Sequence, residues 1–341
     1  MDCMFCIANR RATQFRTLAL SIIHLPFAPS PAAAQSQMEK LHVAFTVIAP
    51  TQLNVWTAKD MGYYARHGLD VDLVLLVGAP LAVAALVGGE TPIVHTGASG
   101  VITSNLAGSG AVLLAGAANR FPYVLFVTEQ IKRVEDLRGK KFGVSRIGSA
   151  DHAAAITVFD KMGIKENEVT YVQAGNIPAR LAAMQTNTLQ ATLLQAPETL
   201  KAKEIGLRVL LDFTKLDGEW QQNGVVVTRD YIKKTPDTIR RFMRAYVDAI
   251  HFNLTNAQGA QKILQKYLAI KDEKPVDEAY NEIVLKLTRR VPYPTEPGIQ
   301  LFFDQLKTKN LKAGQVKPSD FTDVSFLKEL ESSGYIDRLY K

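Results

Sequence analysis

The chain has 341 residues, which is too long for one small module and fits two bodies of ordinary domain size. Hydrophobic residues make up 47% and charged residues 21%, a composition that excludes a disordered or collagen-like chain. The formal net charge is +7, but the Lys and Arg residues are spread along the sequence. Because phosphate neutralisation needs a contiguous basic face, no nucleic-acid partner is expected.

The N-terminal segment has the order of a secretory signal. Arginines within residues 10–16 precede a short apolar run at 18–25, and Ala32 and Ala34 supply small side chains before a cleavage site. We predict a signal peptide at 1–34, cleaved after Ala34, and a periplasmic mature protein without cysteine. The general secretory and twin-arginine routes both remain open, as does a frayed cytosolic N-terminus.

From residue 41 onward the pattern alternates between strands and helices. Strands are predicted at 41–48, 71–77 and 92–95, and helices at 53–64, 81–87 and 101–106. The uncharged stretch 73–89 imitates a membrane span, but Gly78-Ala-Pro80 divides it into a strand and a helix. The alternation predicts parallel strands with crossover helices, and therefore turns at 49–52, 78–80 and 96–99 on one edge of one sheet.

A second set of similar units follows a strand predicted at 121–128 and a charged connection at 129–141. Its strands are expected at 141–145, 169–174, 190–194 and 209–213, and its helices at 151–162, 178–185 and 200–205. The polar segment 214–223 is the candidate return crossover, leading to a strand at 225–228. The rest is predicted to be helical, at 236–250, 257–267, 277–288, 297–306 and 323–330.

The motifs of several enzyme classes are missing. The run from Gly143 to Gly148 has the glycine interval of a phosphate loop, but Ser149-Ala150 stands where Lys and Ser/Thr are needed. Neither a Gly-x-Ser-x-Gly elbow nor the spaced glycines of a dinucleotide fold occurs, and no two mature histidines have metal-site spacing. We therefore expect no catalytic residue, no cofactor and no metal ligand.

Small and hydroxyl residues gather at the predicted strand ends. Such turns present backbone N–H groups at helix N-termini, where the helix dipole favours an anion, although ordinary helix capping explains some of them. Arg120 and Arg146 could hold a carboxylate or sulfonate through paired hydrogen bonds, or could instead pair with a surface acid such as Asp151. The predicted ligand-binding residues are Pro50, Thr51, Gln52, Ala79, Thr96, Gly97, Ala98, Ser99, Arg120, Phe121, Arg146, Gly148, Ser149, Ala150, Gln195 and Trp220.

The segment Ala58-Lys-Asp-Met-Gly-Tyr-Tyr-Ala-Arg-His-Gly-Leu-Asp-Val-Asp-Leu73, with 136–146 and 228–245, resembles a known family. This family comprises the periplasmic solute-binding proteins of ABC importers, in the branch for nitrate, taurine, alkanesulfonates and thiamine precursors. The resemblance implies an α/β type II periplasmic binding protein: two doubly wound lobes around a ligand cleft, with extra C-terminal helices on lobe 1. It implies that lobe 1 comprises 38–122 and 225–341, and lobe 2 comprises 123–224.

The function implied by the resemblance is that of an extracytoplasmic, monomeric component of an ABC importer. It would bind a small, anionic organic solute of sulfonate or carboxylate type between its lobes and deliver it to a membrane permease, without acting as an enzyme. The alternative is an enzyme of the same fold that makes the thiamine pyrimidine. That enzyme depends on a cysteine-rich iron motif, and this chain has no cysteine beyond residue 6.

Overall fold

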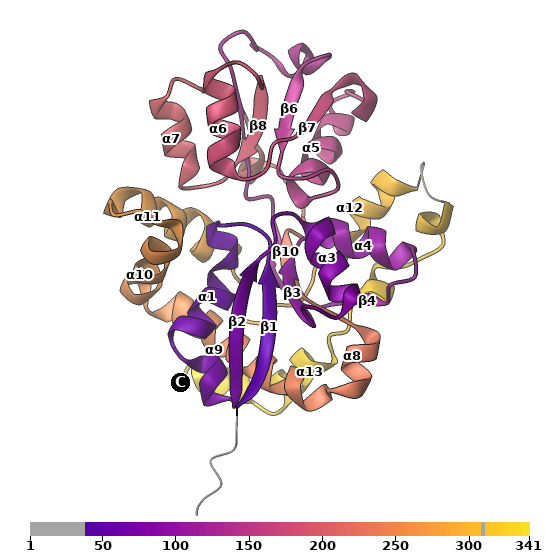
Figure 1. Ribbon diagram of the computed structural model, residues 1–341, viewed down its shortest axis with the longest axis vertical. Helices are drawn as coiled ribbons and strands as arrows, with labels where there is room; N and C mark the ends of the chain where they lie inside the picture. Colours follow the sequence, from indigo (N-terminus) through magenta and orange to yellow (C-terminus); the bar gives the residue numbers. More distant parts are fainter. Residues whose placement is uncertain (1–37, 308–310) are drawn as a thin grey trace, which may run out of the picture. The chain divides into compact units, whose positions relative to one another are not determined.

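The computed structural model describes residues 38–307 and 311–341 (Figure 1). The predicted signal peptide at 1–34 lies outside the described residues. Within the described ranges, no helix has both the length and the apolar character needed to cross a bilayer. The apolar stretch 73–89 is divided between strand β2 (Leu69–Leu75) and helix α3 (Ala79–Gly88), as predicted, with Gly78 at a φ of 88° between them.

The first sheet has five strands in the order β2-β1-β3-β10-β4. Besides β2, they are β1 (Glu39–Phe45), β3 (Ile93–Thr96), β4 (Ala111–Ala118) and β10 (Asn223–Thr228). β1 runs parallel to β2 and β3, as the alternation predicts, whereas β10 is antiparallel to both β3 and β4.

Strand β4 was not predicted, and the expected strand at 121–128 is shorter than predicted. β4 is rich in alanine, which has low strand propensity, yet all eight of its residues are buried. The strand in the later segment is β5 (Val124–Val127), which begins only after Pro122. Proline cannot donate to a strand ladder, so residues 121–123 connect the two sheets instead.

Helices cover both faces of the first sheet. They are α1 (Leu53–Asp60), α2 (Tyr63–Arg66), α3, α4 (Ala98–Leu106), α8 (Arg229–Lys234), α9 (Pro236–Thr255), α10 (Ala257–Leu268), α11 (Glu273–Ala279), α12 (Glu296–Leu306), α13 (Ser325–Ser332) and α14 (Tyr335–Leu339). A π-helical turn at Tyr280–Leu285 continues α11, and short 3₁₀ turns occur at Pro50–Gln52, Leu311–Gly314 and Pro318–Phe321. α9 buries the predicted apolar face, from Ile239 to Ile250, against α1 and α2.

The second sheet also has five strands, in the order β7-β6-β8-β5-β9. Besides β5, they are β6 (Lys141–Val144), β7 (Thr170–Gln173), β8 (Ala191–Leu194) and β9 (Arg208–Asp212). β6 is parallel to β7 and β8, and β5 is antiparallel to β8 and β9. The flanking helices are α5 (Ala150–Lys161), α6 (Ile177–Gln185) and α7 (Glu198–Glu204), with 3₁₀ turns at Val134–Leu137, Glu166–Glu168 and Phe213–Lys215.

Two segments connect the sheets and run beside each other. The chain leaves the first sheet through 119–123 and returns through 216–222. The Trp220 backbone N–H donates to the Asn119 carbonyl at 3.0 Å. The Trp220 ring stacks on Phe121 with ring centroids 4.6 Å apart. Phe302 of α12 packs on the same indole at 4.3 Å. These aromatic contacts join both connections to one buried core.

Candidate functional site

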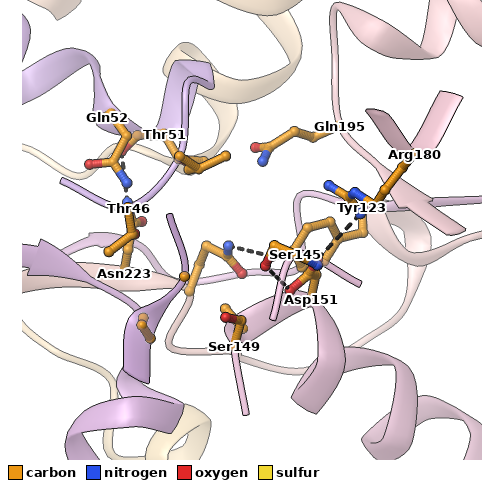
Figure 2. Close-up of a pocket in the computed structure, with 16 residues that line it drawn as sticks. Thr46, Thr51, Gln52, Tyr123, Ser145, Ser149, Asp151, Arg180, Gln195 and Asn223 are labelled. Carbon is orange, nitrogen blue, oxygen red and sulfur yellow. Dashed lines mark hydrogen bonds and ion pairs between the residues drawn. The ribbon is translucent and has the colours of Figure 1, made fainter. Parts of the chain in front are cut away.

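A small pocket of about 40 Å³ lies where segments of the two sheets meet (Figure 2). The turns after β1, β2 and β3 all reach it, as the strand order predicts. We call its residues on segments of the first sheet the first wall: Thr46, Val47, Thr51, Gln52, Gly78, Ala79, Gly97 and Asn223. The second wall comprises Ser145, Ser149, Ala150, Asp151, Arg180 and Gln195, and the connecting segments add Tyr123 and Gln222.

The first wall is made of neutral side chains. Thr51 and Gln52 lie in the 3₁₀ turn after β1, which Pro50 begins. Asn223, the first residue of β10, donates from Nδ2 to the Thr51 carbonyl at 2.9 Å. His95, at the end of β3, lies behind the wall with Nδ1 2.5 Å from the Gln52 Oε1. Burial lowers the pKa of His95 to about 3, so its imidazole is neutral at physiological pH.

The second wall contains a buried ion pair. Arg180 on α6 is 3% exposed, and its Nη1 lies 3.2 Å from the Asp151 Oδ2, 3.0 Å from the Thr192 hydroxyl and 2.9 Å from the Leu193 carbonyl. Asp151 also accepts from the backbone N–H and the hydroxyl of Ser145, each at 2.7 Å. The guanidinium charge is therefore compensated in place, as a buried charge requires.

Tyr123 carries a hydroxyl into the pocket from the first connecting segment. Its oxygen accepts from the Gln222 Nε2 at 2.6 Å, and the Gln222 Oε1 in turn accepts from the Trp220 indole N–H at 2.8 Å. Burial raises the pKa of the Tyr123 hydroxyl, so it keeps its proton. Since its oxygen is the acceptor for Gln222, that proton is available to a molecule in the pocket.

Several buried polar atoms of the pocket have no hydrogen-bond partner among the described residues. They are Thr51 Oγ1, Gln52 Nε2, Ser149 Oγ, Arg180 Nε, Gln195 Oε1 and Asn223 Oδ1. A buried polar group left without a partner costs about 1–3 kcal/mol, so native proteins rarely gather several in one place. Their concentration here indicates a site that a polar molecule completes.

The structure brings some of the predicted ligand-binding residues into the pocket and leaves others outside. Those that line it are Thr51, Gln52, Ala79, Gly97, Ser149, Ala150 and Gln195. Those outside its lining are Pro50, Thr96, Ala98, Ser99, Arg120, Phe121, Arg146, Gly148 and Trp220.

The two arginines proposed from the sequence as anion ligands lie away from the lining. Arg120 is exposed, and Arg146 donates from Nε to the Val77 carbonyl at 3.2 Å beside the pocket. Ser99 likewise has a connecting role, because its hydroxyl donates to the Gly148 carbonyl at 2.9 Å and so links α4 to the turn before α5.

Nine lining residues were not among the predicted ligand-binding residues: Thr46, Val47, Gly78, Tyr123, Ser145, Asp151, Arg180, Gln222 and Asn223. A signal for Arg180 exists: it shares a helix face with Ile177, Leu181 and Met184, all of them buried. A charged residue on an apolar helix face needs a buried partner, which here is Asp151.

No group of three or more His, Cys, Asp or Glu side chains suited to a metal ion occurs within 38–307 and 311–341. The sequence of residues 49–260 matches the family model described as NMT1/THI5 like. The chain belongs to the NMT1/THI5-like family. Among proteins with assigned functions, the taurine-binding periplasmic protein of Escherichia coli is 28% identical over 223 residues, which covers 64% of this chain and 67% of that protein.

Solved structures establish the fold of this family member. The alkanesulfonate-binding protein SsuA of Xanthomonas axonopodis pv. citri, bound to MOPS, matches with a TM-score of 0.70 at 16% identity, covering 83% of this chain and 98% of that one. The periplasmic nitrate-binding protein NrtA of Synechocystis PCC 6803 matches with a TM-score of 0.69 at 13% identity, covering 87% and 89%. The α/β fold of periplasmic binding proteins, predicted from the sequence, is thus confirmed.

Proposed function

We propose that this protein is the extracytoplasmic solute-binding component of an ABC importer, which binds a small polar organic solute and delivers it to a membrane permease. The observation that carries the proposal is the pocket between the two walls, with buried donors and acceptors that have no partner among the described residues. Periplasmic relatives that bind taurine, alkanesulfonates and nitrate support it. The signal peptide at 1–34, cleavage after Ala34 and a monomeric mature protein belong to the same proposal.

The solute has an acidic end in this proposal, held by groups other than Arg120 and Arg146. Gln52 Nε2, Arg180 Nε and the hydroxyls of Thr51 and Ser149 supply donors around the pocket. Helix α5 begins at Ala150 with its N-terminus at the pocket, which adds partial positive charge. Sulfonate and carboxylate groups accept several hydrogen bonds at once and suit this donor set.

Binding is proposed to close two lobes, comprising 38–122 with 225–341 and 123–224, about the paired connecting segments. The two walls approach closely at Gly78, where an added Cβ atom would lie 2.7 Å from the Ser149 hydroxyl. With a pocket of about 40 Å³, a solute larger than a few water molecules enters only when the walls separate. A hinge motion would separate the walls to admit the solute and bring them together again around it.

The test is to identify the solute, to measure its binding and to determine whether the protein alters it chemically. Native mass spectrometry of the purified protein should reveal a retained small molecule, and calorimetry should then measure taurine, ethanesulfonate and nitrate as probes. Gln195→Ala should weaken binding of a bound probe about tenfold, as expected for the loss of one buried hydrogen bond. The matched control Gln185→Ala, at an exposed position on α6, should not.

Recovery of chemically altered probe over more than one turnover would contradict a carrier and favour an enzyme of this family. N-terminal sequencing of protein recovered from the periplasm tests the location, with Gln35 as the expected first residue. An intact Met1 in the cytosol would contradict export.

A further inference from the structure

A line of buried polar side chains leads from helix α1 through the core of the first sheet to the pocket. All six residues are at most 4% exposed. The contacts in order are Thr57 Oγ1 to Asn253 Oδ1 at 2.7 Å, Asn253 Nδ2 to Asn54 Oδ1 at 3.0 Å, Asn54 Nδ2 to Tyr246 Oη at 3.3 Å, Tyr246 Oη to His95 Nε2 at 3.0 Å, and His95 Nδ1 to Gln52 Oε1 at 2.5 Å.

Hydrogen bonds along this line all point toward the pocket. The Asn54 amide donates to the Tyr246 oxygen, so the Tyr246 proton is directed to the His95 Nε2. A neutral imidazole carries one N–H, and accepting at Nε2 places that proton on Nδ1. In this tautomer Nδ1 is the donor in its 2.5 Å contact with the Gln52 Oε1. Burial lowers the pKa of His95 to about 3, which keeps the ring neutral as this arrangement requires.

The contact between His95 and Gln52 determines which end of the Gln52 amide faces the pocket. With Oε1 engaged by His95, its Nε2 is buried and has no partner among the described residues. Asn223 Nδ2 lies 3.4 Å from the His95 Nδ1 but donates to the Thr51 carbonyl at 2.9 Å. With a proton on Nδ1, the longer contact joins two donors and is not a hydrogen bond.

We propose that His95 is a positioning residue, which the Tyr246 hydroxyl holds in the Nδ1-protonated tautomer and which turns the Gln52 amide nitrogen toward the pocket. The first wall then selects an acceptor group on the solute. The opposite tautomer would reverse the Gln52 amide, present its oxygen and select a donor instead. The consequence for the solute rests on the proposed function, whereas the tautomer itself does not.

The tautomer is measured without any ligand. Long-range ¹H–¹⁵N spectra of the labelled protein should show His95 with a protonated Nδ1 and an unprotonated Nε2. Tyr246→Phe removes the proton donated to Nε2 and should give a mixed or Nε2-protonated ring. The control Tyr335→Phe also loses one hydroxyl, which bonds Asp248, and should leave the His95 signals unchanged. A wild-type ring protonated at Nε2, or a ring unaffected by Tyr246→Phe, would overturn the proposal.

Calorimetry with taurine as the probe then tests selection. Tyr246→Phe should weaken binding about fivefold to tenfold, and Tyr335→Phe should not change it. In the background of Gln52→Ala, Tyr246→Phe should have no additional effect, because the amide that it orients is gone. Equal losses in both backgrounds would assign Tyr246 a merely structural role and overturn the proposal. If wild-type protein binds none of the acidic probes, the proposed solute class fails, while the tautomer measurement still decides the role of His95.

Discussion

The two walls of the pocket hold their polar groups in place by different interactions. The first wall presents neutral amides and hydroxyls, and its Gln52 and Asn223 amides bond His95 and the Thr51 carbonyl. The second wall holds a full charge, Arg180, and compensates it with Asp151. The first wall therefore depends on the direction of its hydrogen bonds, whereas the second depends on charge balance. Removing one group should therefore have different consequences on each side.

The largest effect is expected on the second wall. Arg180→Met leaves the Asp151 carboxylate buried without its counter-charge, which should lower the free energy of unfolding by about 3–5 kcal/mol. The double variant Arg180→Met/Asp151→Asn should recover much of this loss, because the uncompensated charge is gone. Urea denaturation followed by circular dichroism measures both. An unchanged midpoint for the single variant would show that the ion pair does not stabilise this wall.

Two buried groups next to the walls should give opposite pH dependences of stability, and the larger effect is expected from His95 behind the first wall. Burial lowers the pKa of His95 from 6.5 to about 3, so the stability that its neutral form contributes is lost as the pH falls below 6.5. Between pH 7 and 4.5 the wild type should lose about 2–3 kcal/mol on this account. His95→Gln removes the titrating group, and its unfolding free energy should decline less over this range than that of the wild type. Identical acid profiles would contradict the assignment.

Beside the second wall, Glu198 should change the free energy of unfolding with pH in the opposite direction to His95. Its backbone N–H bonds the Gln195 carbonyl, and burial raises the pKa of its carboxyl from 4.5 to about 7. The folded state then binds this proton more tightly than the unfolded state, so stability falls as the pH rises from 4.5 to 7. Glu198→Gln should exceed the wild type by about 1–3 kcal/mol at pH 8 and match it below pH 4. The matched control is Glu204→Gln, at an exposed position on α7.

The smallest effects belong to the arginines outside both walls. Arg120→Ala should change the affinity for a bound probe by less than about 0.5 kcal/mol, as expected for an exposed charge. Arg146→Ala loses the hydrogen bond to the Val77 carbonyl, and this loss should weaken the binding free energy of the probe by about 0.5–1 kcal/mol. Calorimetry measures both. A loss of 2 kcal/mol or more in binding free energy for either variant would place that arginine in the binding site.

Local sequence signals were sufficient for most of the fold and for half of the first wall, namely Thr51, Gln52, Ala79 and Gly97. Gly78, Pro50 and the small residues at 96–99 mark strand ends, and strand ends of one parallel sheet meet at one edge. β4 was missed because its alanines lack strand propensity and are strand residues only through burial between neighbours. The antiparallel pairing of β10 also depends on a long-range contact that no local pattern encodes.

In the second wall the sequence predicted Ser149, Ala150 and Gln195 but missed the ion pair, because that pair is a tertiary contact. Asp151 lies in the first turn of α5 and Arg180 lies within α6, and only the folded sheet brings Nη1 to Oδ2. The sequence showed both residues but not their pairing. Its emphasis on Arg146 and Arg120 followed from their positions next to turns, a criterion that cannot separate a pocket residue from one on the surface beside it.

The position of β10 in the first sheet constrains the order in which the chain can fold. β4 ends at Ala118 and β10 begins at Asn223, yet β10 lies between β3 and β4, with the whole second sheet in the intervening sequence. Gly224 must pass so close to β4 that an added Cβ atom would lie 1.9 Å from the Ala115 carbonyl oxygen. Closing a sheet with such a late strand gives a high contact order and slow folding. A nascent chain therefore cannot complete its first sheet until β10, which ends at Thr228, has been synthesised. Until then the first sheet lacks one of its inner strands and the chain remains incompletely folded.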